Sequence, residues 1–241
     1  MGEIRRSLLI NTAGIRINDI IVISGRVEDT QGRKRGRATR KKREWYEGAS
    51  YHIMGRGNRH GVIYRDRDDY GLFLRLLKEV QNRYPFVLQA YCLMTNHFHL
   101  ELTTVNDPIW KIMKPVMNHY ARMFNQKYGY DGHLFDSRYT SCLIEDDRYF
   151  LEVSRYIHLN PVKATMVREP LAYEYSSYRH YMTDGSRKEG EIVTDTSRVL
   201  GAFRTDPREQ YRMFVEGKIS HAEQEMLIMK DMKENELWQP W

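Results

Sequence analysis

The feature that most limits the fold is a pair of strand-like stretches separated by only two residues. Phe86–Met94 reads FVLQAYCLM, and His97–Thr103 alternates polar and apolar side chains with a period of two. So short a connection joins antiparallel neighbours, so the two stretches are predicted to form a β-hairpin. Because residues two apart on a strand share a face, His97 and His99 are expected on the same side of the sheet.

Other periodic segments surround this hairpin. Apolar residues recur with helical spacing in three segments: Asp66–Tyr84, Pro108–Tyr128 and Asp146–Asn160, the last of which is expected to stop at Pro161. Two more strands are predicted: Ser50–Arg56 and His133–Glu145. The order of elements favours an α+β fold, a ferredoxin-like antiparallel sheet sandwich with helices. One sheet face is then left for a ligand and the last helix.

Charge divides the chain into three parts. The whole sequence has 38 Lys+Arg and 32 Asp+Glu, a net charge of +6, but residues 1–43 alone carry +8. Residues 44–182, the predicted domain, carry +1, and residues 183–241 carry −3. The last part is predicted to be a helical C-terminal extension with helices at Thr196–Phe203, Pro207–Glu216 and Ser220–Glu236. The basic N-terminal arm is predicted to be flexible, and such an arm indicates contact with nucleic acid or a solvated tail.

Composition excludes several classes of protein. Hydrophobic residues make up 41% and charged residues 29%, which is typical of a globular chain. The sequence contains no apolar run of about 18 residues, so no membrane span is predicted. Two cysteines, Cys92 and Cys142, are too few for a disulfide framework and fit a reducing compartment. The N-terminal sequence lacks a sustained apolar stretch, so no secretory signal is expected and a cytoplasmic location is predicted.

The histidine pair is the first candidate for chemistry. Two imidazoles on one strand face can share a divalent metal ion, which would leave its other positions to substrate, water or one more side chain. The alternative is that both histidines are structural and satisfied by hydrogen bonds.

A tyrosine and an asparagine on the last predicted helix form the second candidate. Tyr156 and Asn160 are four residues apart and therefore lie on one helix face. The phenol oxygen can act as a nucleophile if it is activated, because its free pKa is near ~10, and the amide oxygen can ligate a metal. Packing and helix termination are the alternative roles. Tyr149 shares the stripe and is the second candidate nucleophile, whereas His158 points away and is interpreted as structural or surface-exposed.

The glycine-containing turn at Gly55–Arg59 is the third candidate. Backbone N–H groups in such a turn can bind an anion, and Arg56 and Arg59 can hold phosphates. An ordinary turn with exposed arginines is the alternative.

Taken together, these segments resemble a known family. NHFHL at Asn96–Leu100 resembles the His-hydrophobe-His (HUH) motif of single-strand DNA nucleases, and the chain resembles their single-tyrosine transposases, especially the REP-associated branch (repetitive extragenic palindrome). Supporting segments are YHIM from Tyr51, GNR from Gly57, YCLMTNHFHL from Tyr91, YIHLNPVK from Tyr156, and SSY from Ser176 with Tyr181. The resemblance covers residues 44–182, with a weaker match at Gln210–Gly217.

The resemblance implies roles for individual residues. His97 and His99 match the metal ligands, Asn160 matches the polar helix residue that completes the site, and Tyr156 matches the nucleophile. The implied metal is Mg²⁺ or Mn²⁺, and the implied partner is single-stranded or hairpin DNA. Tyr156 would form a 5′-phosphotyrosine link and release a 3′-OH, which allows strand transfer without ATP. A homodimer is one of the arrangements that the family resemblance leaves open.

DNA contacts are expected from basic and polar side chains in the turn, near the fourth strand and in the arm. These are Arg56, Asn58, Arg59, Arg138, Arg33, Lys34, Arg35, Lys41, Lys42 and Arg43. The acidic cluster Glu145–Asp147 suits a helix N-terminus but would repel DNA placed close to it. Such an enzyme would be associated with the nucleoid.

Other functions stay open at this level. The chain could bind palindromic DNA or structured RNA without cutting it. A replication-initiator or relaxase-type nuclease would share the histidine pair, although the chain shows no helicase-like region. A hydrolytic two-metal phosphoesterase would need a further His or carboxylate cluster, which is not evident in the sequence.

Overall fold

A computed structural model describes residues 45–183 and 192–217. Its centre is a four-stranded antiparallel sheet in the order β2-β3-β1-β4. The strands are β1 (Ser50–Arg56), β2 (Phe86–Met94), β3 (His97–Thr104) and β4 (Thr140–Ile144). The predicted α+β fold of ferredoxin-like type is therefore confirmed, and β2 and β3 form the predicted hairpin.

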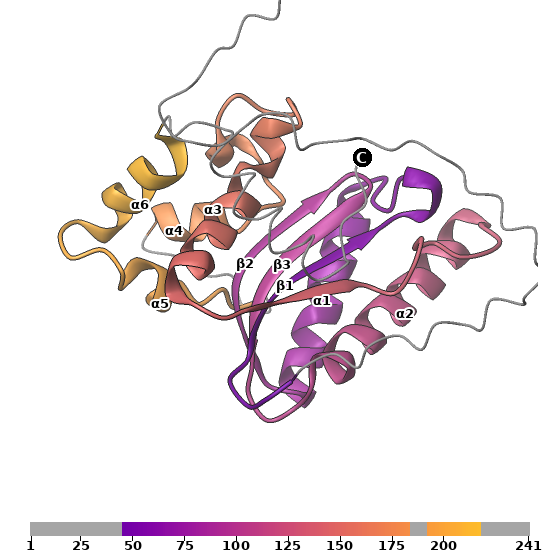
Figure 1. Ribbon diagram of the computed structural model, residues 1–241. Helices are drawn as coiled ribbons and strands as arrows, with labels where there is room; N and C mark the ends of the chain where they lie inside the picture. The colour runs from indigo at the N-terminus through magenta and orange to yellow at the C-terminus, as the bar shows by residue number, and fades with distance from the viewer. Residues whose placement is uncertain (1–44, 184–191, 218–241) are drawn as a thin grey trace, which may run out of the picture. The chain divides into compact units, whose positions relative to one another are not determined.

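Helices α1 (Arg67–Arg83) and α2 (Ile109–Tyr128) cover one face of the sheet (Figure 1). A capping box between Asp66 and Asp69 starts α1, and Gly129, with φ +58°, ends α2 in the left-handed conformation that favours glycine. Their apolar stripes meet the sheet residues Phe98, Leu100 and Leu102, all fully buried.

Helix α3 (Asp147–Lys163) covers the other face, together with the short helices that follow it (Figure 1). These are the 3₁₀ helix η3 (Pro170–Ala172) and the α-helices α4 (Tyr178–Met182), α5 (Ser197–Leu200) and α6 (Pro207–Glu216). The side chain of Asp146 caps α3 by accepting a hydrogen bond from the Tyr149 N–H. The sheet is thus covered on both faces.

Several predicted boundaries are wrong. Helix α3 does not stop before Pro161 but continues to Lys163, because a proline in the final turn removes only one N–H donor, and the backbone N–H groups of Ala164 and Met166 bond the carbonyls of Asn160 and Pro161. The fourth strand begins only at Thr140. The preceding residues instead run along the turn after β1, where Leu134 accepts the Asn58 N–H.

The C-terminal helices match the prediction in part. Helix α6 has the predicted bounds, whereas α5 spans only Ser197–Leu200 of the predicted Thr196–Phe203. The third predicted helix, Ser220–Glu236, and the arm lie outside the described residues, and the domain boundaries at 43 and 182 stay predictions. Within the described part, α6 packs against α3 and α4 through Tyr211, which is fully buried.

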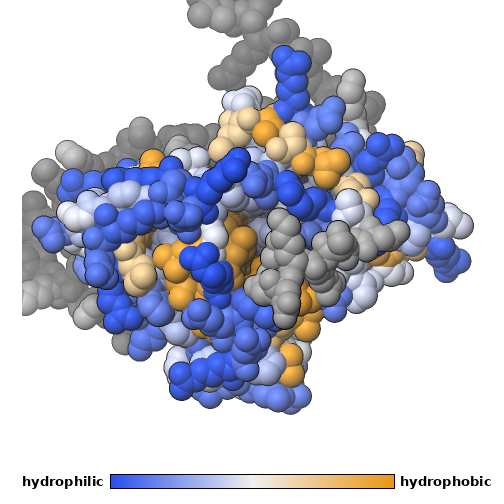
Figure 2. All heavy atoms as spheres, turned by 180° about the vertical axis from the view of Figure 1, so that it is seen from behind, coloured by the Kyte–Doolittle hydropathy of each residue, from blue (hydrophilic) through white to orange (hydrophobic). Residues whose placement is uncertain are grey.

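The surface seen from the side opposite to Figure 1 is mostly hydrophilic, with hydrophobic patches between (Figure 2). Among the large apolar side chains in the described ranges, Met213 and Trp110 are the most exposed, at 65% and 54%. None of the helices in the described ranges combines the length and hydropathy needed to cross a membrane. Cys92 and Cys142 are buried free thiols.

Candidate active site between the sheet and helix α3

Strand β3 presents a row of polar side chains to α3. His97, His99 and Glu101 alternate with the apolar residues that face α1 and α2, as the period of two predicts. The register places His52 of β1 directly opposite Glu101 and places Arg56 opposite His97. Because α3 covers this face, His99 is only 1% exposed and Glu101 is fully buried.

His99 is held by a second histidine. Nδ1 of His99 lies 3.1 Å from Nε2 of His52, and the two rings stack with their centroids 5.3 Å apart. Burial lowers the pKa of His52 to about 4 and the pKa of His99 well below its usual 6.5. Both imidazoles are therefore neutral near pH 7, which is the state that binds a metal ion.

His97 is held in the same way by its neighbour in the sequence. Its Nδ1 lies 2.7 Å from Oδ1 of Asn96, an atom that can only accept, so Nδ1 carries the proton and Nε2 keeps its lone pair. Burial first, and then the charge of Arg56, lowers the pKa of His97 to about 4. The side chain of Asn96 also donates to the carbonyl of His60, which ties it to the turn after β1.

Tyr156, on α3, contacts His99 and His52. Its ring centroid lies 5.4 Å from that of His99 and 5.7 Å from that of His52, edge to face in both cases. The Nζ of Lys163, two helical turns further on, lies 4.9 Å from the centre of the Tyr156 ring. Tyr149 is 8% exposed and belongs to the apolar cluster under α3. The ring contacts favour Tyr156 over Tyr149 as the nucleophile.

Asn160 lies one turn beyond Tyr156 on the same helix. Its Nδ2 donates to the carbonyl of Tyr156 over 2.8 Å, so Oδ1 is the atom with which this side chain could ligate a metal. The structure thus brings His97, His99 and Tyr156 together at one place, with Asn160 on the adjoining turn of α3.

The residues present fit a divalent metal ion. Nε2 of His99 is a buried atom that has no hydrogen-bond partner among the described residues, and such an orphan atom is costly unless something binds it. The described ranges contain no cluster of three or more His, Cys, Asp or Glu side chains that could hold a metal by themselves. A metal here would therefore have two imidazoles and the Asn160 amide oxygen as protein ligands, with substrate or water at the remaining positions.

The face of α3 that points away from the site is anchored by a polar network. His158 is fully buried, and its two ring nitrogens lie 2.7 Å from the Tyr211 hydroxyl and 2.8 Å from Ser177 Oγ. Ser177 Oγ in turn accepts from the Tyr91 N–H on β2. Of the two roles considered for His158, the structure shows the structural one. These bonds fix the rotation of α3 and so the position of Tyr156.

Of the predicted DNA-contact residues, Arg56 ends β1, and Asn58 and Arg59 lie in the turn that follows it. Arg56 forms an ion pair with Asp136 over 3.1 Å, and Arg138 is exposed. Arg59, also exposed, has φ +53°, a strained conformation for a non-glycine residue. The same turn excludes a side chain at Gly57, whose Cβ would lie 2.0 Å from the carbonyl oxygen of Gly61. The predicted contact residues Arg33, Lys34, Arg35, Lys41, Lys42 and Arg43 lie outside the described residues.

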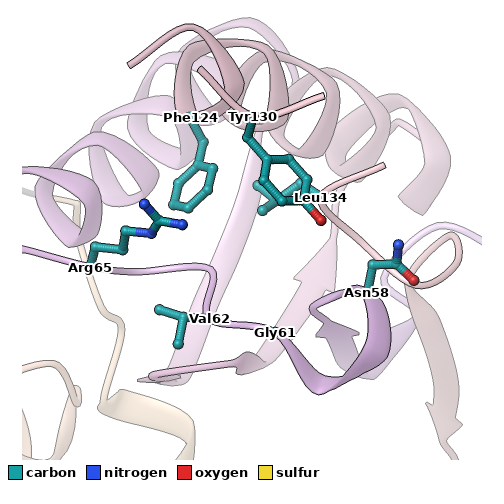
Figure 3. A pocket seen from close by; sticks show the side chains of 7 residues that line it. All are labelled: Asn58, Gly61, Val62, Arg65, Phe124, Tyr130 and Leu134. Atoms are coloured by element: carbon teal, nitrogen blue, oxygen red, sulfur yellow. The ribbon is translucent and has the colours of Figure 1, made fainter. Parts of the chain in front are cut away.

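A cavity of about 270 Å³ adjoins this turn. Asn58, Gly61 and Val62 line it from the turn, and side chains of α2 and the segment after it, Phe124, Tyr130 and Leu134, line it from the facing side (Figure 3). Arg65 closes one end, with its guanidinium 4.4 Å from the ring centre of Tyr128 and 5.5 Å from that of Phe124. Aromatic faces and a guanidinium are groups on which an unpaired base can stack.

Sequence reasoning missed four residues of this region: His52, Asn96, Lys163 and Arg65. Lys163 could have been found, because it follows Tyr156 by seven residues and so shares its helix face. Asn96 directly precedes the histidine pair. The contact of His52 with His99 could not be predicted from the sequence, because it depends on the pairing of β1 with β3.

The fold and the arrangement of these residues agree with the resemblance to single-tyrosine transposases, and so do comparisons with known proteins. Residues 46–160 match the family described as "Transposase IS200 like". For this part of the chain the match confirms the resemblance that was inferred from the sequence. No curated protein matches the sequence.

Two solved structures are similar to this chain. One is a REP-associated tyrosine transposase bound to a REP hairpin, with 17% identity, a TM-score of 0.51, and coverage of 66% of this chain and 93% of the other. At that identity the likeness establishes a shared fold. The other is a structure described as a transposase from Deinococcus radiodurans, with 20% identity, a TM-score of 0.34, and coverage of 49% and 95%.

Proposed function

We propose that this protein is a divalent-metal-dependent, single-strand DNA endonuclease and strand transferase that acts at hairpin DNA. The observation that carries the proposal is the contact of Tyr156 with His99, a buried and neutral imidazole whose ring lies 5.0 Å from that of His97. The similar REP-associated transposase binds a REP hairpin, which supports hairpin DNA as the substrate class. Such a substrate implies action in the cytoplasm, at the nucleoid.

His97, His99 and Asn160 would hold the metal, which would polarise the scissile phosphate as a Lewis acid. Imidazole is a softer ligand than the oxygens that Mg²⁺ prefers, so Mn²⁺ suits this set of ligands better. Lys163 places a positive charge 4.9 Å from the centre of the Tyr156 ring.

The reaction forms one bond to phosphorus and breaks another. The Tyr156 oxygen attacks the phosphorus, the bond to the 3′ oxygen breaks, and the phenol proton is transferred overall to that leaving oxygen. The products are a 5′-phosphotyrosine and a free 3′-OH. A second 3′-OH can reverse the step on a new partner, so the energy of the broken bond is kept in the covalent link.

One chain supplies all the parts of this site. Helix α3 packs on its own sheet, and the His158 network holds it there, so Tyr156 serves the histidines of the same chain. We therefore propose that a monomer suffices for cleavage. Mixing Tyr156→Phe with His99→Ala should restore no activity, whereas restored cleavage would indicate exchange of α3 between the subunits of a homodimer.

The proposed activity is tested with a labelled DNA hairpin that carries a single-stranded flank. With Mn²⁺ or Mg²⁺ the protein should nick the flank and release a product with a free 3′-OH, and a chelator should abolish the reaction. His97→Ala and His99→Ala should be inactive while still binding the hairpin. Tight hairpin binding without cleavage of any flank by the wild type would instead indicate a non-catalytic binding protein.

The DNA path is proposed to cross the turn after β1. The cavity near Arg65 and the candidate ligand His97 both adjoin this turn, because Asn58 lines the cavity while the N–H of Gly57 bonds the carbonyl of Asn96, next to His97. An unpaired base of the flank would stack against Tyr130 in the cavity, and Arg56 and Arg59 would hold the phosphates.

A further inference from the structure

Three buried polar side chains follow one another on the α3 face of the sheet. Glu101 on β3 lies directly opposite His52 on β1, and the His52 ring stacks on His99, two residues before Glu101. All three side chains are at most 1% exposed. One bond of the row is formed in the structure, between Nε2 of His52 and Nδ1 of His99, 3.1 Å apart.

The remaining polar atoms of this row complement each other. Nδ1 of His52 and Oε1 of Glu101 are buried and have no hydrogen-bond partner among the described residues. Directly opposed residues on antiparallel strands have Cβ atoms about 4.5–5.5 Å apart, so the two side chains are neighbours. The other oxygen of Glu101, Oε2, accepts a hydrogen bond from Ser154 Oγ on α3.

We propose that His52 is a positioning residue for the metal site, a role that rests on the proposed function above. Its Nε2 accepts the Nδ1–H of His99. Its own Nδ1–H would be donated to Oε1 of Glu101, since neither of these two atoms has another partner among the described residues. The chain Glu101–His52–His99 then fixes both the orientation of the His99 ring and the tautomer that leaves a lone pair on Nε2.

The direction of the hydrogen bonds between Glu101, His52 and His99 follows from the chemistry of neutral imidazole. Such a ring carries one proton, so a proton on Nδ1 of His99 leaves Nε2 free to bind a metal, and the opposite direction would place the proton on Nε2 and block it. Partners of this kind are general for metal-binding histidines. Asn96 does the same for His97, so each candidate ligand has its own partner, one adjacent in sequence and one on the neighbouring strand.

The test is the affinity for Mn²⁺, measured by titration calorimetry on the full chain without DNA. His52→Phe keeps a ring of similar size but has no acceptor, and it should bind Mn²⁺ about 10–100-fold more weakly than the wild type. His52→Gln places an amide oxygen near the position of Nε2 and should recover most of the affinity. Glu101→Leu should show a smaller loss in the same direction.

Cys92→Ala is the matched control. Cys92 lies directly opposite His99 on β2 and shares its face, yet its Sγ bonds Met94 rather than the imidazole. This variant should bind Mn²⁺ within about twofold of the wild type. Urea unfolding of each variant separates loss of the site from loss of the fold.

Equal Mn²⁺ affinity of His52→Phe and the wild type would overturn the role of His52, and so would equal losses in His52→Phe and His52→Gln. If either of these results is obtained and the wild type still cleaves the hairpin, the proposed function stays intact and only the role of His52 is lost. A wild type that binds no Mn²⁺ would overturn the metal site itself and this inference with it.

Discussion

Strand β3 separates two buried faces of the sheet that differ in chemistry. Phe98, Leu100 and Leu102 point toward α1 and α2 and belong to the apolar core on that side of the sheet. His99 and Glu101 point toward α3, are buried to the same degree, and each retain a polar atom without a partner in the described part of the chain. Burial on the first face stabilises the fold, whereas burial on the second keeps imidazoles neutral and ready to bind a metal.

The largest expected effect on stability comes from breaking the apolar face. Phe98→Ala should lower the free energy of unfolding by about 3–5 kcal/mol, because the ring fills the space over Gly55 and contacts Phe73. His97→Ala, one residue away on the other face, should cost less than half as much and still abolish cleavage. Urea denaturation together with the hairpin assay measures both effects. Equal losses of stability would contradict the distinction between the faces.

The second prediction concerns the polar network behind α3. Burial lowers the pKa of His158 to about 3, with a further contribution from His180, and the ring is surrounded by Tyr178, Tyr181 and Tyr211. The unfolded chain takes up a proton at the usual pKa near 6.5, so stability due to neutral His158 is complete above that pH and is lost as the pH falls toward 3.

His158→Asn tests this dependence. The variant should be less stable than the wild type at pH 7, because it loses bonds to Tyr211 and Ser177. The difference should shrink by about 1–2 kcal/mol between pH 7 and pH 5, since the variant has no imidazole to protonate. Urea unfolding at both pH values measures it. A difference that does not change with pH would mean that His158 is not held neutral.

The sequence predicted one of these two faces better than the other. Period-two alternation placed His97 and His99 on one face of β3, and the helical stripe placed Tyr156 with Asn160 on one face of α3. The family resemblance joined the two pairs into one predicted site. The contact between His52 and His99 was not predictable, because strand order and register are set by long-range pairing. Pro161 misled the prediction of the α3 end because capping by Ala164 and Met166 compensates for the missing donor.

The cavity beside Arg65 gives a third, smaller prediction. Tyr130→Ala should weaken binding of the hairpin with its single-stranded flank by about 1–3 kcal/mol, the usual contribution of one stacked base. Trp110→Ala is a suitable control, because Trp110 is an exposed aromatic residue of α2 that does not line the cavity. Fluorescence anisotropy with flanked and flankless hairpins measures the change. An equal loss for both hairpins would show that the cavity does not bind the flank.

The smallest effect on chemistry is expected from the basic arm. Replacing the eight Lys and Arg residues of segment 33–43 by Gln should reduce the salt dependence of DNA binding, because fewer counterions are released. The rate of cleavage at saturating DNA should stay within about twofold of the wild type, since every proposed site residue lies in 44–182. Loss of cleavage even at low salt would assign the arm a direct part in the reaction.

The most direct test of the central claim is the identity of the residue that becomes linked to DNA. The protein is incubated with Mn²⁺ and a hairpin with a single-stranded flank, digested, and the nucleotide-bearing peptide is sequenced by mass spectrometry. The modified residue should be Tyr156, with the adduct absent in Tyr156→Phe and retained in Tyr149→Phe. An adduct that persists in Tyr156→Phe, or that maps to Tyr149, would contradict the account of the site.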